Sequence, residues 1–111
     1  MRAADAAWVN LRRWKALTDK QRKSFAPICP DFVIEIRSES DKLSGLESKM
    51  QQWIANGAEV AWLIDPISRA VSIYRPGDEH AQQPELLADP TSVQGTGPIA
   101  GFELVMQRIW G

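Results

Sequence analysis

Hydrophobic and charged positions alternate in the stretch PDFVIEIRSESD, residues 30–41. Side chains of a β-strand point alternately to its two faces, so this pattern predicts a strand with two unlike faces. The apolar face carries Phe32, Ile34 and Ile36. The other face carries two carboxylates and a guanidinium, those of Asp31, Glu35 and Arg37. The pattern leaves open why a strand within apolar sequence holds so much charge.

A helical pattern follows this strand and ends near residue 56. Its apolar residues recur at helical spacing, and they are Leu43, Leu46, Met50, Trp53 and Ile54. Ser44 and Glu47 have the spacing of a capping box, which predicts the start of the helix. Gly57 predicts its end, because glycine adopts the left-handed backbone conformation that commonly terminates helices.

Two further strands are predicted after the helix. EVAWLID (59–65) indicates a buried strand, and AVSIYRP (70–76) indicates the return strand of a hairpin turned by PISR. Residues 76–100 are rich in turn-forming residues and predict a loop region with one short strand at ELLA (85–88). GFELVMQRIW predicts a final strand or short helix. Strand, helix, strand and hairpin together predict an α/β fold with a mixed sheet and helices packed on it.

The N-terminal part of the chain is short and basic. RAADAAWV (2–9) predicts a strand, and TDKQ (18–21) matches a capping box for a helix that ends before Pro27. Six basic residues crowd this region: Arg12, Arg13, Lys15, Lys20, Arg22 and Lys23. A solvated helix face is the simpler explanation, and a contact with a nucleic-acid backbone is the alternative.

Composition narrows the class of protein. The 111 residues, 44% hydrophobic and 24% charged, suit one folded domain over 1–111. The net charge of −1 gives no general support for nucleic-acid binding but allows a local basic patch. One cysteine, Cys29, fits a reducing cytoplasm, and with one histidine, His80, it predicts no zinc site. No apolar run approaches the ~20 residues of a membrane span, so we expect a cytoplasmic protein without membrane contact.

Glu35 and Lys49 are the residues with the most chemical interest. Glu35 could lie on a solvated sheet face and pair with Arg37, or it could bind Mg²⁺ together with Asp5 from a neighbouring strand. Lys49 lies at the edge of the apolar stripe, three positions after Leu46. Its ammonium could extend outward along the helix surface, or it could point over the sheet at Glu35.

Four segments together resemble the bacterial putative restriction endonuclease family of the PD-(D/E)xK nuclease superfamily. They are ADAAWV, ALTDKQRKSFAPICPDFVIEIRSESD, LESKMQQWIANGAEVAWLIDPISRAVSIYRPG and GFELVMQRIW. The resemblance implies a restriction-endonuclease-like mixed β-sheet flanked by helices. It also implies a DNA endonuclease that hydrolyses phosphodiester bonds with Mg²⁺ or Mn²⁺.

The resemblance also implies roles for individual residues. Asp5 and Glu35 match the family's acidic metal ligands, and Lys49 matches its catalytic lysine, carried on the helix. Arg37 stands where the superfamily's E-x-K motif has lysine, and we expect Arg37 and Lys42 to bind the DNA substrate. Ala4 departs from the family, which has proline before the first acidic residue.

Family members carry further residues before the ADAAWV strand, so we expect this chain to lack the family's N-terminal segment. Such a short sheet would leave surface exposed, which favours a homodimer or higher homo-oligomer. An alternative function is therefore a catalytically inactive remnant of the fold that acts as an oligomerising interaction module. A third hypothesis is a small-molecule enzyme with Glu35 and Asp65 as an acid–base pair, although Asp65 before Pro66 more simply accepts hydrogen bonds in a turn.

Overall fold

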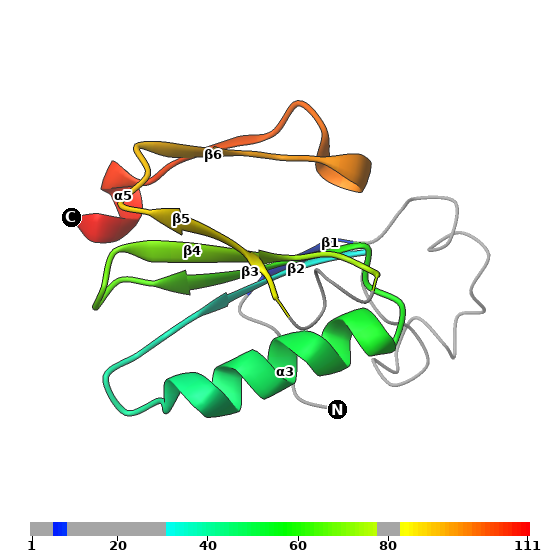
Figure 1. Cartoon of the computed structure of the whole chain (residues 1–111). Helices are drawn as coiled ribbons and strands as arrows, with labels where there is room; N and C mark the ends of the chain where they lie inside the picture. The colour runs from blue at the N-terminus through cyan, green and yellow to red at the C-terminus, as the bar shows by residue number, and fades with distance from the viewer. Residues whose placement is uncertain (1–5, 9–30, 78–82) are drawn as a thin grey trace, which may run out of the picture.

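A mixed five-stranded sheet forms the centre of the fold in the computed structural model, which describes residues 6–8, 31–77 and 83–111 (Figure 1). In sheet order its strands are β1 (Ala6–Trp8), β2 (Phe32–Ile36), β3 (Val60–Asp65), β4 (Ala70–Tyr74) and β5 (Glu85–Ala88). β2 and β3 are parallel, and the other neighbouring pairs are antiparallel. The predicted strand, buried strand and hairpin are therefore confirmed, as is the short strand at ELLA.

Helix α3 (Leu43–Ala55) covers one face of this sheet and connects the two parallel strands (Figure 1). Its end is as predicted, with Asn56 as C-cap and Gly57 at φ 114°. The predicted capping box is wrong, because the helix begins at Leu43 without a side-chain cap. The preceding turn is closed instead by Asp41, whose carboxylate accepts hydrogen bonds from the backbone and hydroxyl of Ser38.

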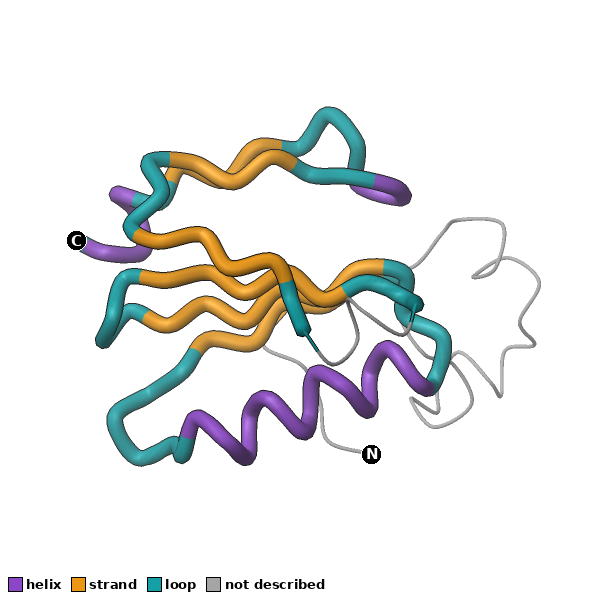
Figure 2. The backbone as a smooth tube through the Cα atoms, viewed as in Figure 1, coloured by secondary structure: helices purple, strands orange, loops and turns teal. Residues whose placement is uncertain are grey.

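The opposite face is covered by a second, smaller layer (Figure 2). This layer consists of β6 (Ser92–Gln94), the 3₁₀ turn η1 (Gly97–Ile99), β7 (Glu103–Val105) and α5 (Gln107–Trp110). The prediction of a loop over residues 76–100 missed β6 and η1, because three-residue elements carry too few positions for a periodic pattern. The closing segment contains both of the predicted alternatives, a strand followed by a short helix.

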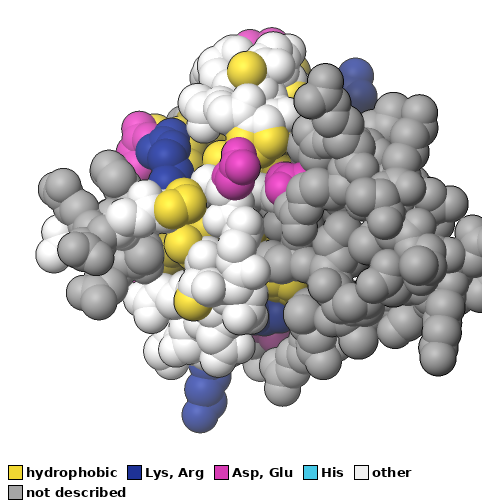
Figure 3. Space-filling view, turned by 90° about the vertical axis from the view of Figure 1, so that its right-hand side faces the viewer, with side chains coloured by type: hydrophobic (Ala, Val, Ile, Leu, Met, Phe, Trp, Pro, Cys, Tyr) yellow, Lys and Arg dark blue, Asp and Glu magenta, His cyan; other side chains and the backbone are white. Residues whose placement is uncertain are grey.

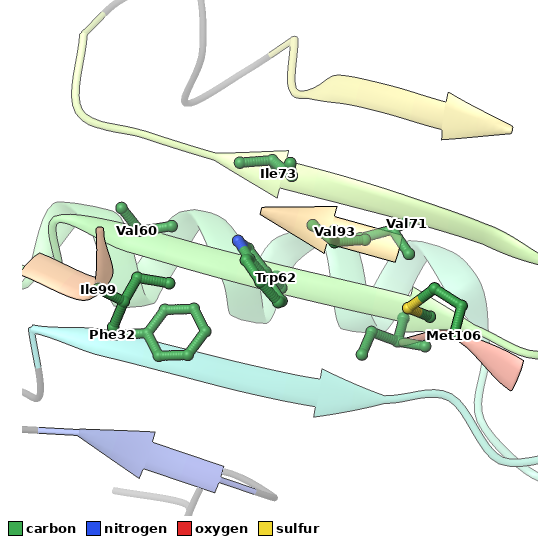
Figure 4. Close-up of a cluster of buried hydrophobic side chains, with 9 residues drawn as sticks. Phe32, Val60, Trp62, Val71, Ile73, Val93, Ile99 and Met106 are labelled. Carbon is green, nitrogen blue, oxygen red and sulfur yellow. The ribbon is translucent and has the colours of Figure 1, made fainter. Parts of the chain in front are cut away.

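Two hydrophobic clusters hold these three layers together. The cluster between the sheet and the β6–β7 hairpin, called the hairpin-side cluster, comprises Phe32, Val60, Trp62, Ile64, Val71, Ile73, Val93, Ile99 and Met106. The helix-side cluster comprises Val33, Met50, Trp53, Ile54, Ala58, Ala61, Leu63 and Tyr74. Trp62 lies in the middle of the hairpin-side cluster, with its ring edge-on to Phe32 at a centroid distance of 5.0 Å (Figure 4). β3 is buried along its whole length because layers cover both faces of the sheet, which explains its uninterrupted apolar sequence.

None of the helices within the described ranges is long and apolar enough to cross a lipid bilayer.

Candidate functional site

Glu35 lies on the face of β2 that α3 covers. It pairs in register with Leu63 of the helix-side cluster, and Val33 of the same cluster precedes it by two positions. Only 3% of Glu35 is exposed to solvent. The hypothesis of a solvated sheet face is therefore wrong, and the charged pattern marks a carboxylate enclosed between sheet and helix. Such a buried carboxylate needs a charged or hydrogen-bonding partner.

Lys49 of α3 provides that partner. Its Nζ lies 3.0 Å from Oε1 of Glu35, so the ammonium points over the sheet rather than outward along the helix. The Lys49 side chain is 19% exposed, whereas that of Glu35 is 4% exposed. The pair therefore lies at the margin of the helix-side cluster, where solvent or a substrate can reach the ammonium.

Trp53 is a second partner of Glu35 that the sequence pattern did not reveal. Its indole Nε1 donates a hydrogen bond to the same Oε1 atom over 3.4 Å. The pattern placed Trp53 only in the apolar stripe, although its i+4 spacing from Lys49 puts both residues on one helix face. Because both contacts fall on Oε1, Glu35 Oε2 is the oxygen left for a further ligand within the described part of the chain.

Arg37 does not pair with Glu35. Its backbone N–H extends the parallel ladder to Ile64 O over 2.9 Å, and its Nη1 lies 3.0 Å from Oδ2 of Asp65. Its Nε lies 3.4 Å from the backbone oxygen of Asp41. The guanidinium is thus held at the carboxyl ends of β2 and β3, and its predicted role in binding substrate stays a prediction.

Asp65 is buried and fully engaged as a hydrogen-bond acceptor. Besides Arg37, its donors are the backbone N–H groups of Ile67 and Ser68 and the hydroxyl of Ser68. Burial by itself raises the pKa of Asp65, but the hydrogen bonds from Ser68, Arg37 and Ile67 outweigh it and lower the pKa below its ordinary value. The carboxylate therefore stays ionised as a turn acceptor, as predicted, and is a poor partner for acid–base chemistry with Glu35.

The turn before α3 brings more charge to the same edge. Hydrogen bonds from the backbone and side chain of Ser38 lower the pKa of Asp41, with smaller contributions from the charges of Lys49 and Arg37. Lys42, the N-cap of α3, is exposed and contacts no carboxylate among the described residues. Glu35, Lys49, Arg37 and Asp65 are thus brought to one end of the sheet, with Lys42 beside them on the surface.

Asp5, the other predicted metal ligand, lies outside the described residues, as do the helix predicted from TDKQ and the basic cluster before Pro27. Within the described ranges, no group of three or more His, Cys, Asp or Glu side chains is placed to hold a metal ion. Of the two predicted metal ligands, Glu35 is the one that the structure describes, and its carboxylate is a hard oxygen donor. Mg²⁺ needs only one or two protein carboxylates because it keeps several waters, so the Glu35 carboxylate is a suitable type of ligand for it.

The surface around the described residues is mixed in charge. On the face seen in Figure 3, the coloured Lys and Arg side chains are separated from one another and form no continuous basic patch. On this face, any contact with a polyanion therefore depends on a few separate cations.

Comparisons with known proteins bear on the family and the fold of this chain. A family model described as "Uma2: Putative restriction endonuclease" matches residues 1–107. Among solved structures, a putative nuclease belonging to DUF820 from Anabaena variabilis matches with 26% sequence identity and a TM-score of 0.61. That match covers 75% of this chain and 45% of the other, so this chain spans less than half of that nuclease's length. No curated protein matches the chain.

Proposed function

The chain belongs to the family described as "Putative restriction endonuclease", and on that premise we propose that it is a divalent-metal-dependent DNA endonuclease that hydrolyses phosphodiester bonds. The observation that carries the proposal is the enclosed Glu35–Lys49 pair, with 3.0 Å between Nζ and Oε1. A buried ion pair adds little net stability, because removing its charges from water costs about as much free energy as their attraction returns. Stabilisation of the fold therefore does not account for the Glu35–Lys49 pair, and a role in catalysis does.

The proposed metal ligands are Glu35, through Oε2, and Asp5. The β1–β2 register supports this choice, because Ala6 pairs with Ile34, the residue before Glu35. Bound Mg²⁺ or Mn²⁺ would supply Lewis-acid stabilisation of the phosphate and a water of lowered pKa. The donors are hard oxygens, which suit both ions and are unsuited to softer metals.

Lys49 would act on the reacting groups directly. Its ammonium has three N–H donors, and among the described residues Glu35 takes one of them, which leaves two for a water or a phosphate oxygen. A cation held in a fixed position near the phosphate stabilises the negative charge that develops in the transition state. Trp53, by donating to Oε1, keeps the Glu35 carboxylate from rotating away from this position.

Arg37 and Lys42 would contact the DNA backbone at the edge of the site. Contacts of this kind position a duplex and carry no sequence information by themselves. They make affinity depend on salt, because each neutralised phosphate releases counterions.

The test is cleavage of plasmid and linear DNA with Mg²⁺ or Mn²⁺, compared with EDTA. We expect the parent protein to cut only with metal, and Glu35→Gln and Lys49→Met to lower the rate by about 100-fold or more. Arg75→Ala is the matched control, since it breaks the Arg75–Glu85 pair of similar length, 3.1 Å, which joins β4 and β5 at the end of the sheet where β3 begins. This control should cut like the parent.

Each other outcome has a definite meaning. A parent that cuts nothing with either metal contradicts the proposal and returns the inactive interaction module as the better explanation. Cleavage that persists in both Glu35→Gln and Lys49→Met places the active site elsewhere.

A further inference from the structure

Arg37 and Asp65 form a second charged pair beside the candidate site. Arg37 follows β2 and Asp65 ends β3, and the parallel register brings Ile36 opposite Ile64 immediately before them. Strand alternation places Arg37 on the same sheet face as Glu35, two residues further along the chain. The second pair therefore lies next to the first, at the edge where the parallel strands end.

Asp65 does not need Arg37 to satisfy its carboxylate. Oδ1 already accepts from the backbone N–H groups of Ile67 and Ser68, at 3.0 and 3.4 Å. Oδ2 already accepts from the Ser68 hydroxyl at 2.9 Å. The turn is thus a preformed acceptor, and the bond from Arg37 is an addition to it.

The addition fixes the arginine. Nη1 is held by Asp65 and Nε by the backbone oxygen of Asp41, so two sides of the guanidinium are tied to the protein. Within the described residues Nη2 has no partner, and 22% of the side chain is exposed. Guanidinium groups recognise phosphate through a planar fork of N–H donors, and fixing the plane in advance lowers the entropic cost of binding.

We propose that Asp65 is a positioning residue, which holds Arg37 so that its free Nη2 edge receives a phosphate of the DNA backbone next to the cleavage site. The inference rests on the proposed nuclease function and adds a role for an acidic residue that touches neither metal nor substrate.

The sign of one substitution separates positioning from simple electrostatics. Asp65→Asn removes a negative charge close to bound DNA, so electrostatics alone would tighten binding. The asparagine oxygen can still accept from the turn, but its amide N–H₂ faces Arg37 donor to donor. Arg37 is then released, so positioning predicts weaker binding.

The experiment measures binding of a labelled DNA duplex by fluorescence anisotropy in EDTA, where no cleavage occurs, over a series of salt concentrations. We expect Arg37→Ala and Asp65→Asn each to weaken binding about tenfold. Arg37→Ala should also lower the slope of log K against log salt by about 1. In the Arg37→Ala background, Asp65→Asn should have no further effect, because both changes remove the same contact.

Two variants guard against a general loss of structure. Arg37→Lys keeps the charge and the ion pair but has no fork, so it should weaken DNA binding as Arg37→Ala does. Ser68→Ala removes one hydrogen bond from Asp65 and leaves Arg37 in place, so it should bind like the parent. If Ser68→Ala weakens binding as much as Asp65→Asn, the effect comes from the turn and the inference is wrong.

The two proposals fail in different ways. A parent that binds no DNA at any salt concentration overturns the nuclease proposal and this inference with it. A parent that binds DNA, together with an Asp65→Asn protein that binds equally well or better, overturns only the role of Asp65.

Discussion

At the scale of single residues, burial decides what a charge means. Glu35 and Glu85 are both strand carboxylates with a basic partner, but the side chain of Glu35 is 4% exposed and that of Glu85 is 47% exposed. Exposed ion pairs contribute little to stability, whereas removing one partner of a buried pair leaves an uncompensated charge. Glu35 therefore depends on Lys49 in a way that Glu85 does not depend on Arg75.

This dependence predicts a specific pattern of stabilities. Lys49→Met should lower the free energy of unfolding by about 2–4 kcal/mol, because it strands the Glu35 carboxylate. The double variant Glu35→Gln, Lys49→Met should be more stable than Lys49→Met alone, since the charge is gone as well. Urea denaturation followed by tryptophan fluorescence measures both. Arg75→Ala should cost less than about 1 kcal/mol, and an equal cost for Lys49→Met would contradict the buried pair.

Tyr74 offers a second residue-scale prediction, because it is the chain's only tyrosine. Burial, with a smaller contribution from the charge of Glu47, raises the pKa of Tyr74 to about 12 from its ordinary 10.0. Between these values the native state holds a proton that the unfolded state has lost, so stability falls as pH rises through this window. Ultraviolet difference absorbance should show phenolate forming near pH 12 in native protein and near 10 in urea. Tyr74→Phe should remove this alkaline loss of stability, and a native titration near 10 would show that the ring is exposed.

At the scale of elements, one face of α3 both packs on the sheet and carries Lys49 of the candidate site. Its buried residues Met50, Trp53 and Ile54 fasten it to the sheet, and Lys49 lies beside them. The helix therefore fixes the position of the ammonium by its apolar packing. Substitutions on the exposed side of the helix should change the free energy of unfolding without changing the geometry of the site.

One glycine within this helix and one just after it allow that separation to be tested. Gly45 lies in the helix, and a Cβ there would meet no atom within 4 Å. Gly45→Ala should stabilise the protein by about 0.5–1 kcal/mol, because alanine favours the helix and restricts the unfolded chain. The urea midpoint should rise while DNA cleavage stays unchanged.

Gly57 is the matched control for this substitution. A Cβ there is equally free of contacts, but the backbone has φ +114°. Gly57→Ala should therefore destabilise the protein by about 1 kcal/mol or more. If both substitutions had the same sign, backbone conformation would not be the cause.

At the scale of the whole molecule, the sheet leaves an edge that predicts self-association. β5 is the outer strand next to β4 in the described sheet, and its Leu86 is 64% exposed. Unpaired strand edges readily pair with a second chain. The homodimer or higher oligomer expected from the sequence stays a prediction at this point, with β5 as its candidate contact.

Sedimentation velocity tests this prediction. The parent should sediment as a dimer or larger species, and Leu86→Lys should shift it towards the monomer, because a charge on the edge opposes strand pairing. Ile67→Lys is the control, since Ile67 is 56% exposed but lies in the β3–β4 turn. A parent that is monomeric at all concentrations would contradict the expectation.

The sequence by itself determined the local elements of the central layers. Period-two alternation, the apolar helix stripe and a glycine stop each depend on residues a few positions apart, so β2, α3 and the β3–β4 hairpin were predictable. The short β6 and η1 were not, because their stability comes from packing on Trp62 and pairing with β7 rather than from their own residues.

Only the tertiary structure decided what the charged residues do. The sequence pattern singled out Glu35 and Lys49 but left open whether each faced solvent. The packing of α3 on β2 brings them together as an ion pair. The sequence pattern also gave Trp53 no polar role and did not predict that Arg37 would pair with Asp65. The physical reason is that ion pairing and desolvation depend on distances between segments far apart in the chain, which no local period encodes.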